Sequence, residues 1–332
     1  MIKKFIDFCQ SENIFYDDFA PAQKIVVAVS GGADSLALAD LLYNVRQRFK
    51  LQLCIAHYEH GLRGQDSLDD AAFVEEFAKN LGVKFFCEHG DVKKFAAENK
   101  ISIETAARKL RYNFLNRVRE DLDFDAIALA HHADDQAETI LMRLLRGATS
   151  AGLSAMKFIV ETDDYGTLLR PLLRFRKVEL ESYCALHGLV PRIDATNFET
   201  DATRNKIRWE LLPALEKFNP NIVETLCRLG EVTADEADFI DEDAEEVLPY
   251  VTKRLPSKEY AIVRDDFLSL HKATQRAVIK KFLAGVTGIE DFGFVHFEAV
   301  RKVLVNGLSG VELPHKFRAD LQKGKLTIRK NI

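Results

Sequence analysis

Short apolar runs rich in branched side chains alternate with longer segments of helical period through the first two hundred residues of this chain. Such runs are typical of parallel strands that are buried on both faces and joined by crossover helices. The predicted strands are 24–30, 51–58, 84–91, 125–131 and 168–172, and the predicted helices are 35–49, 67–81, 102–121 and 134–146. The pattern predicts an α/β fold with a doubly wound parallel sheet, whose ligands bind beyond the carboxyl ends of its strands.

After residue 203 the apolar pattern becomes mainly helical. Helical segments are expected at 204–218, 273–284 and 297–305, and two short strand-like runs lie near the end. A long acidic amphipathic stretch separates the first of these helices from the rest. We therefore predict an α/β domain over 1–218, a helical linker over 219–250 and a small C-terminal domain over 251–332.

The cysteines and the hydropathy of the chain restrict the classes of protein to which it can belong. The 332 residues include five cysteines with no C-x-x-C pair, so neither a zinc ribbon nor a disulfide framework is written here. Charges interrupt the N-terminal apolar stretch too early for a signal peptide, and no apolar run approaches membrane-spanning length. These features predict a cytoplasmic protein with no membrane partner.

The formal net charge of −5 gives no overall attraction to nucleic acid, but the charge is unevenly distributed. Basic residues dominate 301–332, whereas 235–246 is strongly acidic. This asymmetry permits a local phosphate-binding surface, and it equally fits two solvated faces of opposite sign.

The run 24–42 combines a buried strand, a turn with two glycines and the start of a helix. Glycines let backbone N–H groups approach an anion, and a helix N-terminus adds partial positive charge. The turn therefore predicts a phosphate site rather than a simple strand-to-helix connection. Asp34 would repel phosphate unless a divalent cation lies between them, so it implies Mg²⁺. The predicted phosphate-binding residues are Ser30, Gly31, Gly32, Ala33, Asp34 and Ser35.

A second polar run follows the strand predicted at 125–131. It carries His131, His132, Asp134, Asp135 and Glu138 at the start of a helix. Three carboxylates are thus expected together at one strand end, although acids in a first helical turn are also ordinary capping residues.

Two of these runs resemble a known family. The sequence SGGADS resembles the SGGxDS loop of the PP-loop (N-type ATP pyrophosphatase) superfamily, whose members transfer AMP to a carbonyl-type oxygen and then displace it with a nucleophile. The sequence HHADDQAET resembles the corresponding segment of tRNA(Ile)-lysidine synthetases. Three further segments match that family, namely 56–63, 104–112 and 194–208.

The resemblance implies roles for individual residues. The implied catalytic residues are Asp34, Asp135, Arg108, Arg204 and Arg208, with Asp34 and Asp135 on the metal. The implied ATP-binding residues are those of the loop with His57, Arg63 and Arg111. The implied substrate-binding residues are His131, His132, Asp134, Glu138, Glu104, Asp194, Asn197 and Asn205. From spacing alone, Arg108 and Arg111 fit solvated helix positions equally well.

The resemblance implies an enzyme that uses ATP and Mg²⁺ to join L-lysine to the wobble cytidine of tRNA(Ile) with a CAU anticodon. A homodimer is one way for a short C-terminal region to hold tRNA. The alternatives are a PP-loop tRNA thiolase, which needs a cysteine set absent here, and an amidating synthetase for small molecules. A nucleotide-sensing module without turnover is a third alternative, which only an assay separates.

Overall fold

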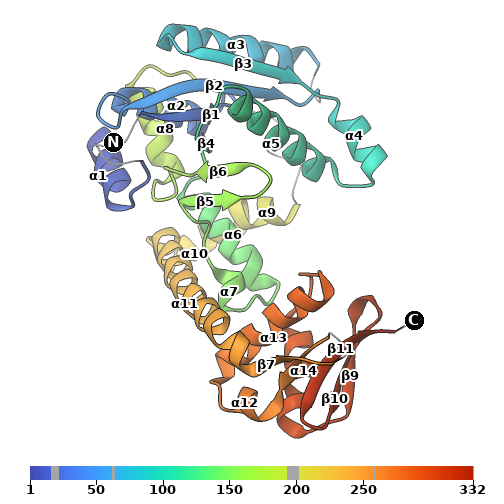
Figure 1. The fold of residues 1–332 in the computed structure, drawn as a ribbon. Coiled ribbons are helices and arrows are strands. Elements are labelled where there is room, and N and C mark those ends of the chain that lie inside the picture. The colour runs from blue at the N-terminus through green and yellow to red at the C-terminus, as the bar shows by residue number, and fades with distance from the viewer. Residues whose placement is uncertain (16–21, 62–63, 193–201, 257–258, 332) are drawn as a thin grey trace. The chain divides into compact units, whose positions relative to one another are not determined.

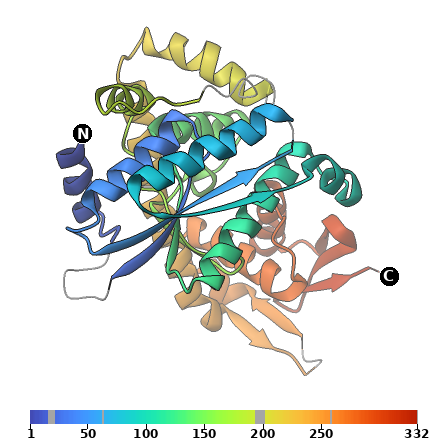
Figure 2. The same cartoon turned by 90° about the horizontal axis from the view of Figure 1, so that it is seen from above.

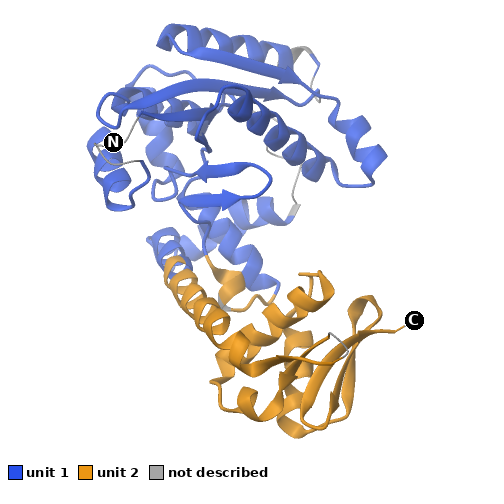
Figure 3. Cartoon of the chain, viewed as in Figure 1, with its two compact units in different colours: residues 1–146, 155–230 blue, residues 147–154, 231–332 orange. Residues whose placement is uncertain are grey.

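The fold is described from a computed structural model that covers residues 1–15, 22–61, 64–192, 202–256 and 259–331 (Figure 1). The chain forms two compact units, one of residues 1–146 with 155–230 and the other of 147–154 with 231–332 (Figure 3). In the described part of the chain, no helix is both long and apolar enough to cross a bilayer.

A six-stranded sheet lies at the centre of the first unit. Its strands are β1 (Gln23–Ala28), β2 (Leu51–Glu59), β3 (Lys84–His89), β4 (Ala126–Ala128), β5 (Ile159–Thr162) and β6 (Gly166–Leu169). The order is β3-β2-β1-β4-β6-β5, and all neighbours are parallel except the β5–β6 hairpin. The predicted doubly wound α/β sheet is confirmed, and β5 is an added antiparallel edge strand that the apolar pattern did not indicate.

Helices cover both faces of this sheet (Figure 2). One core packs α1 (Ile2–Ser11), α2 (Ala33–Val45), α3 (Gln65–Leu81) and α8 (Lys177–Leu186) against the strands. The other packs α4 (Val92–Asn99) and α5 (Ile103–Asp121) against the opposite face. Because β1 and β4 are adjacent, the helices that follow them, α2 and α6 (Ala133–Leu145), begin at neighbouring strand ends.

The segment after residue 201 departs from the single helix expected at 204–218. It consists of α9 (Ala202–Lys206), a π-helical turn η2 (Ile207–Leu211) and α10 (Leu212–Glu216). A long helix α11 (Ile222–Val251) follows, where a helical linker was predicted. π-helical turns are rare and concentrate at functional sites, so this departure from the regular α-helix makes the segment a candidate part of such a site.

The second unit contains α7 (Ser150–Leu153), α12 (Arg264–Leu268), α13 (Lys272–Thr287), α14 (Phe294–Asn306) and a five-stranded sheet. The sheet order is β7 (Thr252–Arg254), β8 (Tyr260–Val263), β11 (Lys325–Lys330), β10 (Phe317–Gln322) and β9 (Gly310–Leu313), all antiparallel. A short 3₁₀ turn, η3 (Pro314–Lys316), joins β9 to β10. Two strands were expected near the end of the chain, where the structure has three, β9, β10 and β11. Strands β7 and β8 were not predicted, because they are too short to stand out by period.

The acidic stretch 235–246 is not merely a solvated face. Asp241 pairs with Lys280 at 3.3 Å and Glu245 pairs with Lys281 at 2.8 Å, so the stretch binds the basic side of α13. On the basic stretch, Arg318 is likewise paired, to the carboxylates of Glu312 on β9 and Asp320 on β10.

Candidate active site

The glycine turn after β1 is shaped by its own hydrogen bonds. Gly31 adopts a φ of +94°, which lets the backbone turn sharply away from the strand. The Ser35 hydroxyl accepts from the Ser30 N–H at 3.1 Å and donates to the Gly32 carbonyl at 3.0 Å, and Gly32 caps α2. The turn therefore places the first N–H groups of α2 at the carboxyl end of β1, as an anion site needs.

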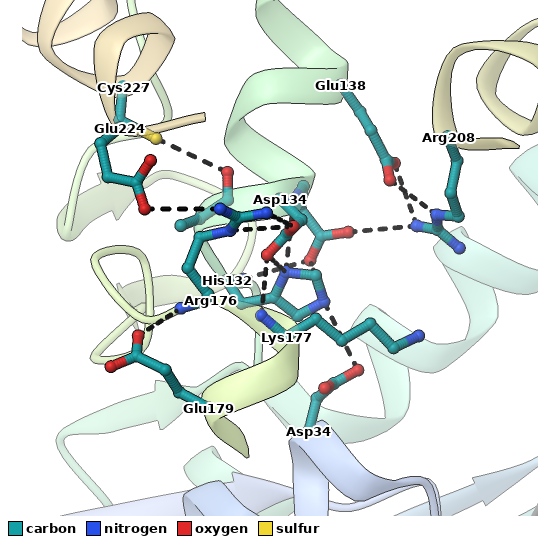
Figure 4. A network of polar contacts seen from close by, with 12 residues as sticks. Asp34, His132, Asp134, Glu138, Arg176, Lys177, Glu179, Arg208, Glu224 and Cys227 are labelled. Atoms are coloured by element: carbon teal, nitrogen blue, oxygen red, sulfur yellow. Dashed lines mark hydrogen bonds and ion pairs between the residues drawn. The ribbon is translucent and has the colours of Figure 1, made fainter. Parts of the chain in front are cut away.

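Asp34 lies in the first turn of α2, where its carboxylate faces the second polar run. Its Oδ1 atom is buried and makes no hydrogen bond within the described residues. Its Oδ2 atom lies 3.5 Å from Nε2 of His132 (Figure 4). A buried carboxylate oxygen without a donor is an available ligand for a hard cation.

His132 joins the loop to the start of α6. Besides Asp34, its Nε2 atom lies 3.6 Å from Asp135 Oδ2, and its Nδ1 atom lies 3.7 Å from Asp134 Oδ2. Burial alone would lower the pKa of His132, but the three carboxylates, Asp135 foremost, together raise it to about 9. Burial likewise opposes ionisation of Asp135, yet His132 foremost lowers its pKa. Asp34 and Asp135 therefore face the His132 ring from two adjacent strand ends.

Asp134 points toward α8 and not toward the loop. It accepts the Lys177 N–H at 2.7 Å and the Arg176 Nε–H at 3.1 Å (Figure 4). Arg176 also binds Glu216 at 2.9 Å and Glu224 at 3.4 Å. This network ties α6 to α8, α10 and the start of α11. Within the described residues, the contacts of Asp134 therefore indicate a structural role.

Glu138 lies one turn into α6 and is fully buried. Arg208 holds it with two bonds, Nε to Oε1 at 2.6 Å and Nη2 to Oε2 at 3.0 Å, and Arg204 Nε lies 3.4 Å from Oε2. Arg208 also reaches within 3.6 Å of Asp135 Oδ1. The two arginines thus face the site as predicted from their spacing, but Glu138 engages both, and the π-helical turn rather than a regular α-helix presents Arg208.

His131 faces away from His132. Successive side chains of extended backbone point to opposite sides, and His132 is extended with φ −125° and ψ 179°. The pKa of His131 is lowered to about 3, first by burial and then, against the attraction of Asp135, by Arg170, Arg111 and Arg108. His131, the first histidine of the pair, is therefore neutral beside a group of arginines on the α5 side of the sheet.

The remaining predicted residues lie in different surroundings. His57 is buried in β2, where its Nδ1 atom lies 2.8 Å from the Val29 carbonyl oxygen directly before the loop. Glu104 is exposed in the first turn of α5, and Asn205 lies in α9 between the two arginines that face Glu138. Arg63, Asp194 and Asn197 lie outside the described residues.

Sequence reasoning missed three basic residues at this end of the sheet. Arg170 directly follows β6, and Arg176 and Lys177 open α8. A signal was present, because 170–177 carries four basic residues at and just beyond the end of the strand predicted at 168–172, and ligands of such sheets bind beyond the carboxyl ends of the strands.

The geometry matches one class of protein. The PP-loop domain family matches residues 6–215 of this chain. Among solved structures, the U34-tRNA thiolase NcsA from Methanococcus maripaludis has a similar fold, with a TM-score of 0.58 at 21% identity over 70% of this chain and 78% of that chain. The chain therefore belongs to the PP-loop domain family.

Its relatives in sequence narrow that class. The chain is 38% identical over 288 residues to the tRNA(Ile)-lysidine synthase of Clostridium perfringens, covering 86% of this chain and 59% of that protein. It is 38% identical to that of Geobacter sulfurreducens over 90% of this chain and 63% of that protein. It is 33% identical to that of Caldanaerobacter subterraneus over 99% of this chain and 69% of that protein. Within the PP-loop class, the chain belongs to the tRNA(Ile)-lysidine synthase family, and it spans about three fifths of the length of the first two relatives.

Proposed function

We propose that this chain joins L-lysine to C2 of the wobble cytidine in tRNA(Ile) with a CAU anticodon, using ATP. The observation that carries the proposal is the pairing of a pyrophosphate-type loop with the Asp34–His132–Asp135 contact at the neighbouring strand end. The names of the relatives supply the substrate, and the family supplies ATP use.

Two bond exchanges make up the reaction. The cytosine O2 attacks the α-phosphorus of ATP, and pyrophosphate leaves with the electrons of the broken Pα–O bond. The lysine ε-nitrogen then attacks C2, AMP leaves with O2, and the surplus proton of the amine passes to solvent or a base. Adenylation is needed because the carbonyl oxygen is otherwise a poor leaving group.

The chain contributes mainly position and charge. The N–H groups at the start of α2 face the phosphates that become pyrophosphate, and Arg208, fixed by Glu138, holds a guanidinium beside Asp135. His132 holds both acids in place through its positive charge.

Asp34 and Asp135 fit a Mg²⁺ site. Mg²⁺ takes one or two carboxylates and completes its shell with water and phosphate oxygens, and the unpartnered Oδ1 of Asp34 is a suitable ligand. Within the described residues, no group of three or more His, Cys, Asp or Glu side chains that could hold a metal ion is found. When bound, the ion would neutralise negative charge on the phosphates.

The cysteines do not favour the thiolase alternative. All five are free, and only Cys87 is exposed. Burial raises the pKa of Cys54 to about 12 and that of Cys184 to about 11, so neither thiol ionises readily.

The wider roles rest on the same proposal. We assign the second unit to tRNA contact, supported by exposed basic residues on its last strands, among them Lys323, Lys325 and Arg329. A tRNA substrate supports a cytoplasmic location. The homodimer stays a prediction that sedimentation measurements test.

The test is incorporation of labelled lysine into purified tRNA(Ile) with an unmodified CAU anticodon, with a methionine tRNA as the negative substrate. We expect ATP-dependent incorporation into tRNA(Ile) alone and its loss in Asp34→Asn. The matched control is Asp40→Asn, on the same helix but bonded to the Tyr183 hydroxyl at 2.5 Å, which should keep activity. ATP consumption that needs neither lysine nor tRNA would refute the substrate assignment.

A further inference from the structure

Three arginines gather around one tyrosine on the α5 side of the sheet. The guanidinium carbons of Arg108 and Arg111 lie 4.6 Å and 5.5 Å from the centre of the Tyr112 ring. Arg170, at the carboxyl end of β6, lies within electrostatic reach of Arg108 and of the Tyr112 hydroxyl. His131 completes the group, since its pKa responds to all three arginines.

Among the described residues, no carboxylate forms an ion pair with Arg108, Arg111 or Arg170, whereas buried cations in proteins are normally paired. Arg170 is only 8% exposed, and its fixed bond is from Nη1 to the Lys157 carbonyl oxygen at 2.9 Å. Its Nε, the Nε of Arg111 and the Tyr112 hydroxyl are buried and form no hydrogen bond of ordinary geometry within the described residues. Burial foremost, and after it Arg108, lowers the pKa of both Arg111 and Arg170, against the opposing effect of Tyr112.

A cluster of this kind is costly without an anion. Like charges repel, and a buried charge without a partner loses its hydration with no compensation. A buried polar group without a partner in a native protein calls for an explanation, such as a catalytic role or a bound water or ion, and groups with strongly shifted pKa values cluster at functional sites. Guanidinium groups are suited to phosphate, because two N–H groups bind two oxygens at once.

The cluster is separate from the pyrophosphate loop. His132 faces Asp34 and the loop, whereas His131, the preceding residue, faces the arginines. The loop therefore contacts His132, whereas the arginines act on the residue before it. The exposure of the cluster is graded, with Arg108 at the surface, Arg111 half-buried and Arg170 buried, so a phosphate of a polymer can enter from solvent.

We propose that Arg108, Arg111 and Arg170 form a phosphodiester-binding site that holds the RNA backbone next to the reacting cytidine. The inference rests on the proposed function, because that function requires an RNA nucleotide beside His131 and Asp135. Arg170 is the positioning residue at its buried end. This assignment moves Arg111 from the nucleotide, where the family resemblance puts it, to the RNA.

The experiment measures the affinity of the full chain for a CAU anticodon stem-loop over a range of salt concentrations. Arg170→Gln should weaken RNA binding about tenfold or more. The plot of the logarithm of the observed association constant against the logarithm of the salt concentration should become shallower by about 0.7, the value for one phosphate contact to a single strand. Arg170→Lys should keep the slope and lose part of the affinity, because an ammonium cannot form the two-point bond. Arg108→Gln, at an exposed position, gives the same slope change without a risk to folding.

A control and a second ligand separate the possible outcomes. Arg117→Gln removes an exposed arginine of the same helix that is paired with Glu88, and it should bind RNA like the wild type. The affinity for a non-hydrolysable ATP analogue should be unchanged in all four variants. Loss of ATP affinity with unchanged RNA affinity would show that the cluster binds nucleotide phosphates and would overturn the inference.

Different results would refute the phosphodiester site and the proposed function. If the wild-type chain binds the stem-loop and incorporates lysine while Arg170→Gln and Arg108→Gln match it in affinity and slope, the phosphodiester site is refuted and the function stands. If the wild-type chain binds no RNA, both fall.

Discussion

Replacing Arg208 with methionine should destabilise the first unit through the carboxylate that it leaves behind. Glu138 is fully buried, and Arg208 supplies its two short bonds. Removing one partner of a buried ion pair costs about 3–5 kcal/mol. The Arg208 side chain is 22% exposed and Arg204 remains 3.4 Å from Glu138, so we expect a loss of about 2–3 kcal/mol.

The size of this loss should depend on pH. Burial, only partly offset by Arg208, already raises the pKa of Glu138, and removal of the guanidinium raises it further. A carboxyl with a raised folded-state pKa costs stability when it is ionised and little when it is protonated. The destabilisation caused by Arg208→Met should therefore shrink as the pH falls.

The chain provides its own probe for this measurement. Trp209 is the only tryptophan, and it sits beside Arg208 in the π-helical turn. Urea unfolding followed by its fluorescence reports on this unit, with Arg228→Met, at an exposed position of α11, as the control.

The double variant Glu138→Gln, Arg208→Met tests the reasoning. If the cost comes from a stranded buried charge, the double variant should recover more than about 1 kcal/mol relative to the sum of the single changes. A loss below about 0.5 kcal/mol in Arg208→Met, or strict additivity in the double variant, would refute the argument.

Three further predictions follow from packing, charge and thiol exposure. Gly230→Ala should lower stability by about 1–3 kcal/mol in urea unfolding, because the added Cβ would lie 2.8 Å from Cβ of Ala155; an unchanged midpoint would contradict this. The hydrogen bond from Arg301, foremost, lowers the pKa of Glu298 from 4.5 to about 2, against a small opposing effect of burial. The contribution of Glu298 to folding stability is therefore present above pH 4.5 and lost as the pH falls toward 2. Glu298→Gln should therefore flatten acid unfolding of the second unit, measured by circular dichroism between pH 5 and pH 2, and an unchanged acid profile would count against it. Cys87 alone should react rapidly with Ellman's reagent in the native chain and all five thiols in denaturant, whereas several fast thiols would show that the cores are open.

Much of the first unit followed from local pattern. The apolar strands and the Gly31–Gly32 turn are specified by residues adjacent in sequence, because period and φ preference are local properties. The alternation of strands and helices then fixed which strand ends carry the site, and the loop and the acidic run do lie at neighbouring strands.

The second unit was harder to predict for a physical reason. Strands β7 and β8 are three and four residues long, and antiparallel pairing with distant partners stabilises them rather than their own composition. The edge strand β5 alternates weakly and depends on its hairpin with β6.

By itself, the sequence determined the class of fold, the glycine turn after the first strand and the set of acids and bases at the strand ends, because each is encoded by neighbours along the chain. Only the tertiary structure decided the partners of those groups. It turned Asp134 toward Arg176, bonded Glu138 to Arg208, and brought Arg170 to Arg108 and Arg111. Ion pairing and burial depend on distance in space, and residues 42 to 70 positions apart in sequence come into contact only when the chain is folded.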